Sequence, residues 1–113
     1  MKNKEELINS LKQLSQTQPQ GFTVDLNMNH ISKGFAVAVI DTQDSFGEEG
    51  LENVAEFAIE NDLSIGGWFS EDNQKFYWDA VKVINNKKEA IGFGKLNQQF
   101  AIFDLEEQEL III

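Results

Sequence analysis

The stretch from Ser64 to Ile84 constrains the fold most, because it predicts a β-hairpin. It reads SIGGWFSEDNQKFYWDAVKVI and contains both tryptophans and the only tyrosine. Two runs rich in aromatic and β-branched residues flank the polar group from Ser70 to Gln74, which is typical of two antiparallel strands joined by a loop of about five residues. We therefore expect the rest of the chain to pair with this hairpin or to pack on it.

Two more strands are expected before the hairpin. Apolar and polar residues alternate from Phe22 to Met28, as in a strand with one buried face. The stretch from Phe35 to Ile40 is apolar on both faces, which places it in the interior of a sheet and not at an edge. Ala36 and Ala38 share one of these faces, and their small size would let a helix approach closely there.

The N-terminal segment predicts a short amphipathic helix. Asn3 and Glu6 have the spacing of a capping box, and apolar residues follow at helical spacing. The only proline, Pro19, lies in a polar stretch that ends the helix and is typical of a linker. We therefore divide the chain into a helix with its linker over residues 1–20 and a single domain over residues 21–113.

Residues 45–61 and 86–96 predict two more helices, because each stretch opens with a capping box. The pairs are Ser45 with Glu48 and Asn86 with Glu89. The second helix contains Gly92 and Gly94, and a glycine costs roughly 1 kcal/mol relative to alanine inside a helix. Close packing on the sheet is the expected reason for one of these two glycines.

Strands at 100–105 and 109–113 complete the pattern of an α+β protein. We expect two layers, in which an antiparallel sheet carries its helices on one face. From residue 35 to residue 105 the order of elements matches the βαββαβ order of ferredoxin-like folds, with the N-terminal helix and the flanking strands as additions. A different α+β topology is the alternative.

The charge of the chain limits its partners. Nineteen acidic residues against nine lysines, with no arginine, give a formal net charge of -10. Such a field repels phosphate backbones, so direct nucleic-acid binding is not expected, and it favours a basic protein partner. The alternative explanation of the acidity is solubility alone.

The predicted helix at 46–61 carries a row of glutamates that no lysine of the same helix offsets. Its members are Glu49, Glu52, Glu56 and Glu60. At this spacing they lie along one face and repel one another by a few tenths of a kcal/mol per pair. We predict that the row is a face for binding a partner. In a sharper form of this hypothesis, the row imitates the spacing of phosphates and blocks a host nucleic-acid-binding protein.

The hairpin carries a second candidate surface, which is aromatic. Its members are Trp68, Phe69, Tyr77 and Trp78. If the helices cover one face of the sheet, the outward half of this set forms a recognition platform or a homodimer interface. The alternative is that the set is ordinary core. RNA stacking is disfavoured, because such platforms come with basic surroundings.

Asp79 is the candidate for a small-ligand or catalytic pocket. It lies mid-strand, where an aspartate is disfavoured. A buried carboxylate with a raised pKa would serve as an acid or base in a pocket between the hairpin and the helix at 86–96. The alternative is an aspartate that bonds to backbone or faces water. His30 is the only histidine, so a histidine-based triad or zinc site lacks its partners, and we expect no metal and no cofactor.

The absence of cysteine suits a reducing cytoplasm. The longest apolar runs are far shorter than the roughly 18 residues of a membrane span, and the N-terminus lacks the apolar core of a signal peptide. We therefore expect a cytoplasmic protein that makes no contact with a membrane.

Several glycine and aromatic motifs carry a resemblance to a group of known proteins. The motifs are Gly66-Gly67-Trp68, Tyr77-Trp78-Asp79, Glu89-Ala90-Ile91, Phe93-Gly94 and Ala101-Ile102-Phe103-Asp104-Leu105. Over residues 35–105 the chain resembles small uncharacterised proteins encoded by phages and conjugative elements, and modules of large multidomain phage proteins. The resemblance implies an accessory protein of a mobile element and implies no particular activity.

Together these observations predict a non-enzymatic module that binds a protein partner through its acidic helix face or its aromatic sheet face. Two other classes stay open. One is a small-ligand or catalytic domain with its pocket near Asp79, and the other is a structural module that dimerises through its sheet.

Overall fold

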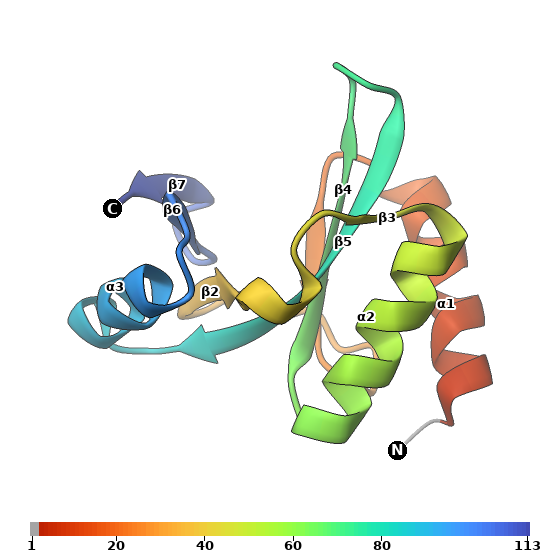
Figure 1. Cartoon of the computed structure of the whole chain (residues 1–113), viewed down its shortest axis with the longest axis horizontal. Helices are drawn as coiled ribbons and strands as arrows, with labels where there is room; N and C mark the ends of the chain where they lie inside the picture. Colours follow the sequence, from red (N-terminus) through yellow and green to blue (C-terminus); the bar gives the residue numbers. More distant parts are fainter. Residues whose placement is uncertain (1–2) are drawn as a thin grey trace.

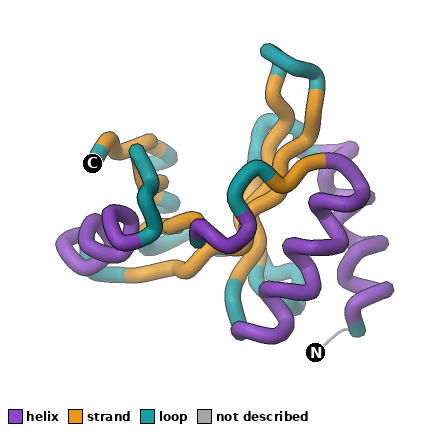
Figure 2. Tube along the Cα trace, viewed as in Figure 1, coloured by secondary structure: helices purple, strands orange, loops and turns teal. Residues whose placement is uncertain are grey.

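The predicted hairpin is the centre of the observed sheet. The computed structural model describes residues 3–113, which form three α-helices and a seven-stranded antiparallel sheet that does not close (Figures 1 and 2). The hairpin consists of β4 (Ser64–Ser70) and β5 (Lys75–Ile84), which pair over the whole length of β4. The predicted α+β class with an antiparallel sheet is confirmed.

The other elements surround this hairpin. In chain order they are α1 (Lys4–Thr17), β1 (Phe22–Val24), β2 (Phe35–Ala38), the 3-10 helix η1 (Ile40–Thr42), β3 (Ser45–Phe46), α2 (Gly47–Asn61), α3 (Lys87–Leu96), β6 (Ala101–Asp104) and β7 (Glu109–Ile112). The sheet order is β1-β4-β5-β2-β6-β7, and β3 pairs with β5 beside β2. Because β5 lies between β2 and β4, the chain forms the split βαβ arrangement of ferredoxin-like folds.

The helices α2 and α3 cover the same face of the sheet (Figure 1). Val54 of α2 packs in one cluster with Val39, and Ala90 of α3 packs in another with Val37. Residues two apart along a strand point to the same side, so both helices lie on the side of Val37 and Val39. The opposite face is covered by no helix of the described residues.

The helix α1 packs into the core beside α2 (Figures 1 and 2). Leu7 and Leu11 are both 0 % exposed and belong to the same cluster as Val54 of α2 and Val24 of β1. The capping role of Asn3 is confirmed, because its side-chain oxygen accepts a hydrogen bond from the Glu6 N–H at 2.8 Å. Whether residues 21–113 fold without α1 stays a prediction.

The predicted cap at Ser45 is wrong. The helix α2 begins at Gly47 with Phe46 as its N-cap, and the Ser45 hydroxyl donates instead to the Thr42 carbonyl at 2.8 Å. Ser45 is held away from the helix because it pairs with Trp78 in β3. The cap at Asn86, which has no such pairing, is confirmed by its hydrogen bond from the Glu89 N–H at 3.0 Å.

The first strand is shorter than the alternation predicts, because Asp25 ends it. The Asp25 carboxylate accepts hydrogen bonds from the N–H groups of Asn27 and Asn29 at 2.9 and 3.0 Å, which closes a turn directly after Val24. Partial burial acts to raise the pKa of Asp25, but the hydrogen bonds from Asn29 and Asn27 outweigh it and leave the pKa below its usual value.

The two alanines of β2 do not receive a helix, contrary to the expectation. Val37 points toward α3, so Ala36 and Ala38 point to the opposite face, where Ala36 clusters with Val81 and Leu105. Their small side chains therefore leave room on the uncovered side of the sheet.

The two glycines of α3 give a matched pair of substitutions. A Cβ added at Gly94 would lie 2.6 Å from Ile113 Cδ1 and 3.0 Å from Ile102 Cγ2, whereas at Gly92 it would meet nothing within 4 Å. We expect Gly92→Ala to raise the free energy of unfolding by up to about 1 kcal/mol, and Gly94→Ala to be less stable than Gly92→Ala by at least about 1 kcal/mol. Urea titration of both variants measures the difference, and equal stabilisation would contradict the packing at Gly94.

Candidate functional site

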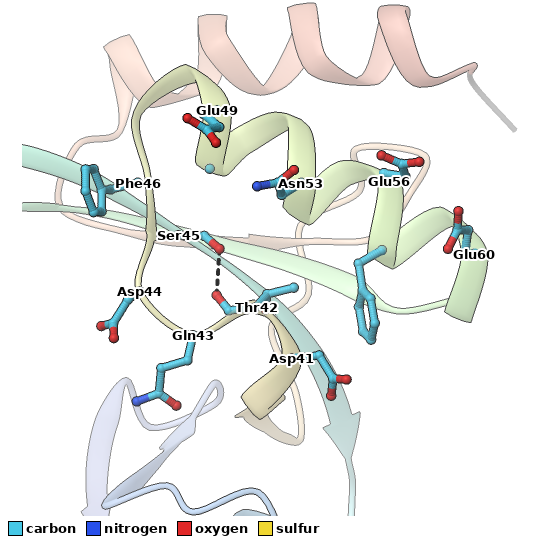
Figure 3. A pocket seen from close by; sticks show the side chains of 12 residues that line it. Asp41, Thr42, Gln43, Asp44, Ser45, Phe46, Glu49, Asn53, Glu56 and Glu60 are labelled. Carbon is cyan, nitrogen blue, oxygen red and sulfur yellow. Dashed lines mark hydrogen bonds between the residues drawn. The ribbon is translucent and has the colours of Figure 1, made fainter.

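A groove lined by five acidic residues and, among the described residues, by no basic residue lies between α2 and the segment 41–46 (Figure 3). Its volume is about 620 Å³. We call it the acidic groove and define it by its lining residues, which are Asp41, Thr42, Gln43, Asp44, Ser45, Phe46, Glu49, Gly50, Asn53, Glu56, Phe57 and Glu60. The acids from the segment 41–46 and those from α2 come from different elements, so the groove gathers charge that the helix sequence alone does not reveal.

The segment 41–46 forms the wall because the chain leaves the sheet after β2. The predicted strand at 35–40 ends early: the Val39 N–H still donates to the Ala80 carbonyl at 3.0 Å, but Ile40 already belongs to η1. Thr42 is 4 % exposed, and its hydroxyl oxygen accepts a hydrogen bond from the Ala80 N–H at 3.0 Å. The hydroxyl thus takes the place of the backbone carbonyl that a partner strand would have offered to Ala80. The chain then returns to the sheet at Ser45. This excursion places Asp41 and Asp44 beside α2.

The start of α2 closes tightly on this segment at Gly50. A Cβ at this position would lie 2.6 Å from the carbonyl carbon of Ser45. Only glycine allows the helix to approach the backbone of the segment so closely. The glycine thereby fixes the position of the two walls of the acidic groove relative to each other.

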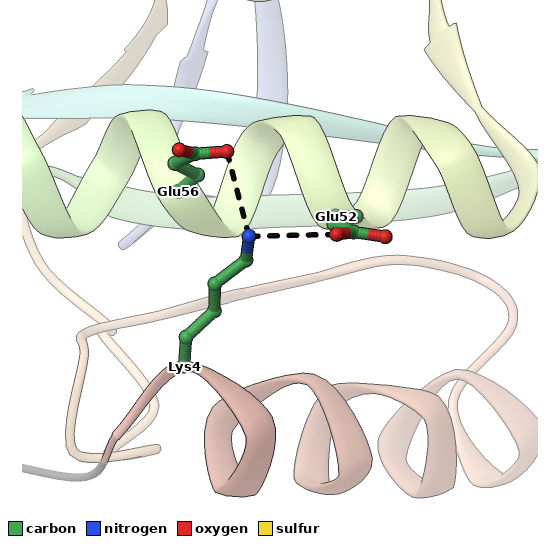
Figure 4. A network of polar contacts seen from close by, with 3 residues as sticks. All are labelled: Lys4, Glu52 and Glu56. Atoms are coloured by element: carbon green, nitrogen blue, oxygen red, sulfur yellow. Dashed lines mark hydrogen bonds and ion pairs between the residues drawn. The ribbon is translucent and has the colours of Figure 1, made fainter.

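The predicted row of four glutamates is divided by Lys4 of α1, which pairs with two of its members. Lys4 Nζ lies 3.5 Å from Glu52 Oε1 and 3.4 Å from Glu56 Oε2 (Figure 4). Loss of solvent alone would lower the pKa of Lys4. The negative charges of Glu56 and, to a smaller extent, of Glu52 outweigh this effect and raise the pKa above its usual value. Lys12 pairs in the same way with Glu48 at 3.2 Å. These contacts do not follow from the sequence of α2, because no lysine lies on that helix.

The other carboxylates of the acidic groove keep their charge unpaired. Within residues 3–113, Asp41, Asp44, Glu49 and Glu60 form no ion pair and no side-chain hydrogen bond. All four are exposed. They are spread along the walls of the groove, and no three acidic or histidine side chains of the described residues gather as a metal ion requires. The arrangement suits an extended cationic group and not a single ion.

The four predicted aromatic residues are divided between the two faces of the sheet. Trp68 is 45 % exposed and stacks on Tyr77, with the ring centroids 5.2 Å apart and the planes inclined by 17°. Trp78 points to the helix side, is 3 % exposed and packs against Phe76 at 4.7 Å. Phe69 pairs with Phe76 and therefore lies on the same side as Trp78. Only Trp68 and Tyr77 face outward, and a homodimer through them stays a prediction.

Asp79 lies on the uncovered face, opposite Gly66 of β4. The pocket expected between the hairpin and the helix at 86–96 is therefore in the wrong place, because α3 packs on the other side of the sheet. Within the described residues the Asp79 carboxylate has no hydrogen bond and no ion pair. Burial, and to a smaller extent the negative charge of Asp44, raise the pKa of Asp79 to about 6. His30 is exposed in a loop whose backbone bridges to Val24.

Comparison with protein-family models, with curated proteins and with solved structures found no match to this chain. The resemblance to proteins of phages and conjugative elements therefore stays a prediction. Among residues 3–113, none of the helices has the length and apolar character that a membrane crossing requires.

Proposed function

We propose that the chain is a non-enzymatic binding module that holds a lysine- or arginine-rich segment of a protein partner in the acidic groove. One observation supports the proposal above all others: Asp41 and Asp44 of the segment 41–46 and Glu60 of α2 line a single groove, and none of them is neutralised by a described residue. A concave site lined by one sign of charge concentrates the opposite charge and speeds association.

The groove also offers apolar contact to the stems of long cationic side chains. Phe57 is partly buried along the groove, and Phe46, which is 41 % exposed at one end, already has the Lys75 ammonium 4.0 Å from the centroid of its ring. Lysine and arginine pack their methylene groups on such surfaces while their charged ends reach carboxylates. In its sharper form the proposal takes the partner to be a nucleic-acid-binding protein, because the basic surface of such a protein binds the regularly spaced negative charges of nucleic-acid phosphates. Inhibition of that partner by a mobile-element protein in the cytoplasm is the biological role that fits.

A charge-matched pair of variants tests the site. In the groove variant, Asp41→Asn, Asp44→Asn, Glu49→Gln and Glu60→Gln remove four unpaired carboxylates. In the control, Glu71→Gln, Asp72→Asn, Glu106→Gln and Glu107→Gln remove four exposed carboxylates elsewhere. Binding of a fluorescent lysine- and arginine-rich peptide is followed by anisotropy at about 0.1 M and about 1 M salt. At the lower salt concentration we expect the groove variant to bind the peptide at least about tenfold more weakly than the parent chain, and the affinity of the control to stay within about threefold of the parent chain.

Two outcomes would contradict the proposal. Equal losses in the groove variant and in the control would show that net charge, and not the groove, attracts the peptide. Affinity that is unchanged between low and high salt would exclude a contact made by exposed charges, since such contacts are screened.

A further inference from the structure

A second groove lies on the uncovered face of the sheet. Its volume is about 780 Å³, within the range of sites that hold small organic molecules. Residues of β4 and β5 line it on one side and residues of β6 and β7 on the other. We call it the sheet groove. Its floor is made of small or apolar residues, including Ala36, Ala38, Gly66 and Val81. The helices that fill the other face do not reach this space.

Asp79 points into the sheet groove with no side chain beside it in the neighbouring strands. Its partner in β4 is Gly66, and on the other edge of β5 the chain makes its excursion between Val39 and Ser45. The carboxylate therefore stays without a hydrogen bond or an ion pair from any described residue. An unpaired charge in a partly buried, largely apolar site is costly, and this cost is a recurrent property of binding sites.

The charges around Asp79 define what the groove can accept. Asp44, which does not line the sheet groove, adds negative charge from the segment 41–46, and His30 is the one titratable residue besides Asp79 among the described residues that line the groove. Trp68, stacked on Tyr77, forms an apolar and aromatic wall. One carboxylate above an apolar floor fits a single positive charge on an apolar body, and not a metal ion or a chain of many charges.

We infer that the sheet groove binds an organic monocation, whose ammonium group pairs with Asp79 while its apolar body covers Ala36, Ala38 and Val81. This site differs from the acidic groove in position and in ligand, because the acidic groove lies on the helix side and fits a segment with several charges. Asp44 lines the acidic groove and its charge also acts on Asp79, but the carboxylate that would pair with the ammonium is Asp79, which does not line the acidic groove. Asp79→Asn therefore tests this proposal alone.

Two matched ligands and three variants test the inference. The ligands are 2-phenylethylamine and its uncharged analogue 2-phenylethanol, titrated by NMR against the parent chain, Asp79→Asn, Ala38→Leu and the charge control Asp72→Asn. We expect the parent chain and Asp72→Asn to bind the amine saturably and at least about tenfold more tightly than the alcohol. Asp79→Asn should lose this preference, and Ala38→Leu, which fills the floor, should weaken both ligands. Amine binding to the parent chain should also weaken as the pH falls from about 8 to about 5, because Asp79 takes up a proton.

Three outcomes would overturn the inference. The first is equal binding of the amine and the alcohol by the parent chain. The second is a preference for the amine that persists in Asp79→Asn, since the ammonium group would then bind to other carboxylates, for example those of the acidic groove. The third is the absence of saturable amine binding up to about 10 mM, a concentration at which even weak small-molecule sites are occupied. Thermal unfolding of each variant confirms that a loss of binding is not a loss of fold.

Discussion

Replacing Leu11 with alanine is expected to lower the free energy of unfolding by about 2–5 kcal/mol. Leu11 is 0 % exposed and packs with Leu7, Val54 and Val24 in the cluster that joins α1, α2 and the sheet. The substitution removes buried methyl groups and leaves a cavity between three elements that cannot all close on it. Urea-induced unfolding, followed by tryptophan fluorescence, measures the loss.

The control for this prediction is Gln13→Ala, an exposed position of the same helix. It should change stability by less than about 0.5 kcal/mol, as surface substitutions usually do. If Leu11→Ala proved as mild as Gln13→Ala, α1 would be an appendage and not part of the core. The ion pair of Lys4 with Glu56, which lines the acidic groove, would then not be fixed.

Replacing Asp79 with asparagine is expected to stabilise the folded chain at neutral pH. The pKa of this carboxyl rises from 3.8 to about 6 on folding, mainly through burial. This shift means that the charged carboxylate lowers the free energy of unfolding by at most about 3 kcal/mol. Asparagine keeps the shape of the side chain and never carries the charge. The gain should appear above about pH 7 and vanish at pH values well below 3.8.

The direction of the pH dependence follows from which state ionises first. At pH values well below 3.8 the carboxyl is protonated in both the folded and the unfolded chain and has no effect on the equilibrium. Between about pH 4 and about pH 6 the unfolded chain ionises first, so the free energy of unfolding falls as the pH rises. Above about pH 7 both states are ionised and the cost is constant.

Denaturant unfolding at several pH values, for the parent chain and for two variants, checks this prediction. Asp79→Asn should flatten the fall between about pH 4 and about pH 6, whereas Asp72→Asn, at an exposed turn position, should leave it in place. Asp44→Asn should move the fall to lower pH, because Asp44 contributes to the raised pKa of Asp79. Parallel pH profiles for all of these chains would contradict the account of Asp79.

Local interactions in this fold could be predicted from the sequence, and interactions between distant segments could not. The caps at Asn3 and Asn86 follow from contacts three residues apart, which a sequence shows directly. The cap at Ser45 failed because a partner 33 residues away, Trp78, holds that serine in a strand. The order of elements from residue 35 to residue 105 did indicate the split βαβ arrangement, because connections between neighbouring elements allow few arrangements, whereas the short strand β3 before α2 was not expected.

The same limit applies to the candidate sites. The helical spacing placed Glu49 and Glu60 on one exposed side, but it could not show that Lys4 reaches Glu52 from another helix or that Asp41 and Asp44 join the groove. An aspartate in the middle of a strand is disfavoured, and Asp79 does occupy an unusual, partly buried position. Its surroundings depend on Gly66 and on the excursion after β2, and neither is near it in the sequence. The small size of Ala36 and Ala38 predicted the close approach of a helix, but both side chains point to the face that no described helix covers.

The most direct test of the acidic groove is to map the binding of a lysine- and arginine-rich peptide by ¹⁵N amide chemical shifts. We predict that the largest changes fall in the segment 41–46 and along α2 from Glu49 to Glu60, and that Phe103 and Leu110 in the sheet groove change little. Changes that are spread evenly over the exposed acids, or that centre on a different surface, would contradict the proposal that this groove is where the chain receives its partner.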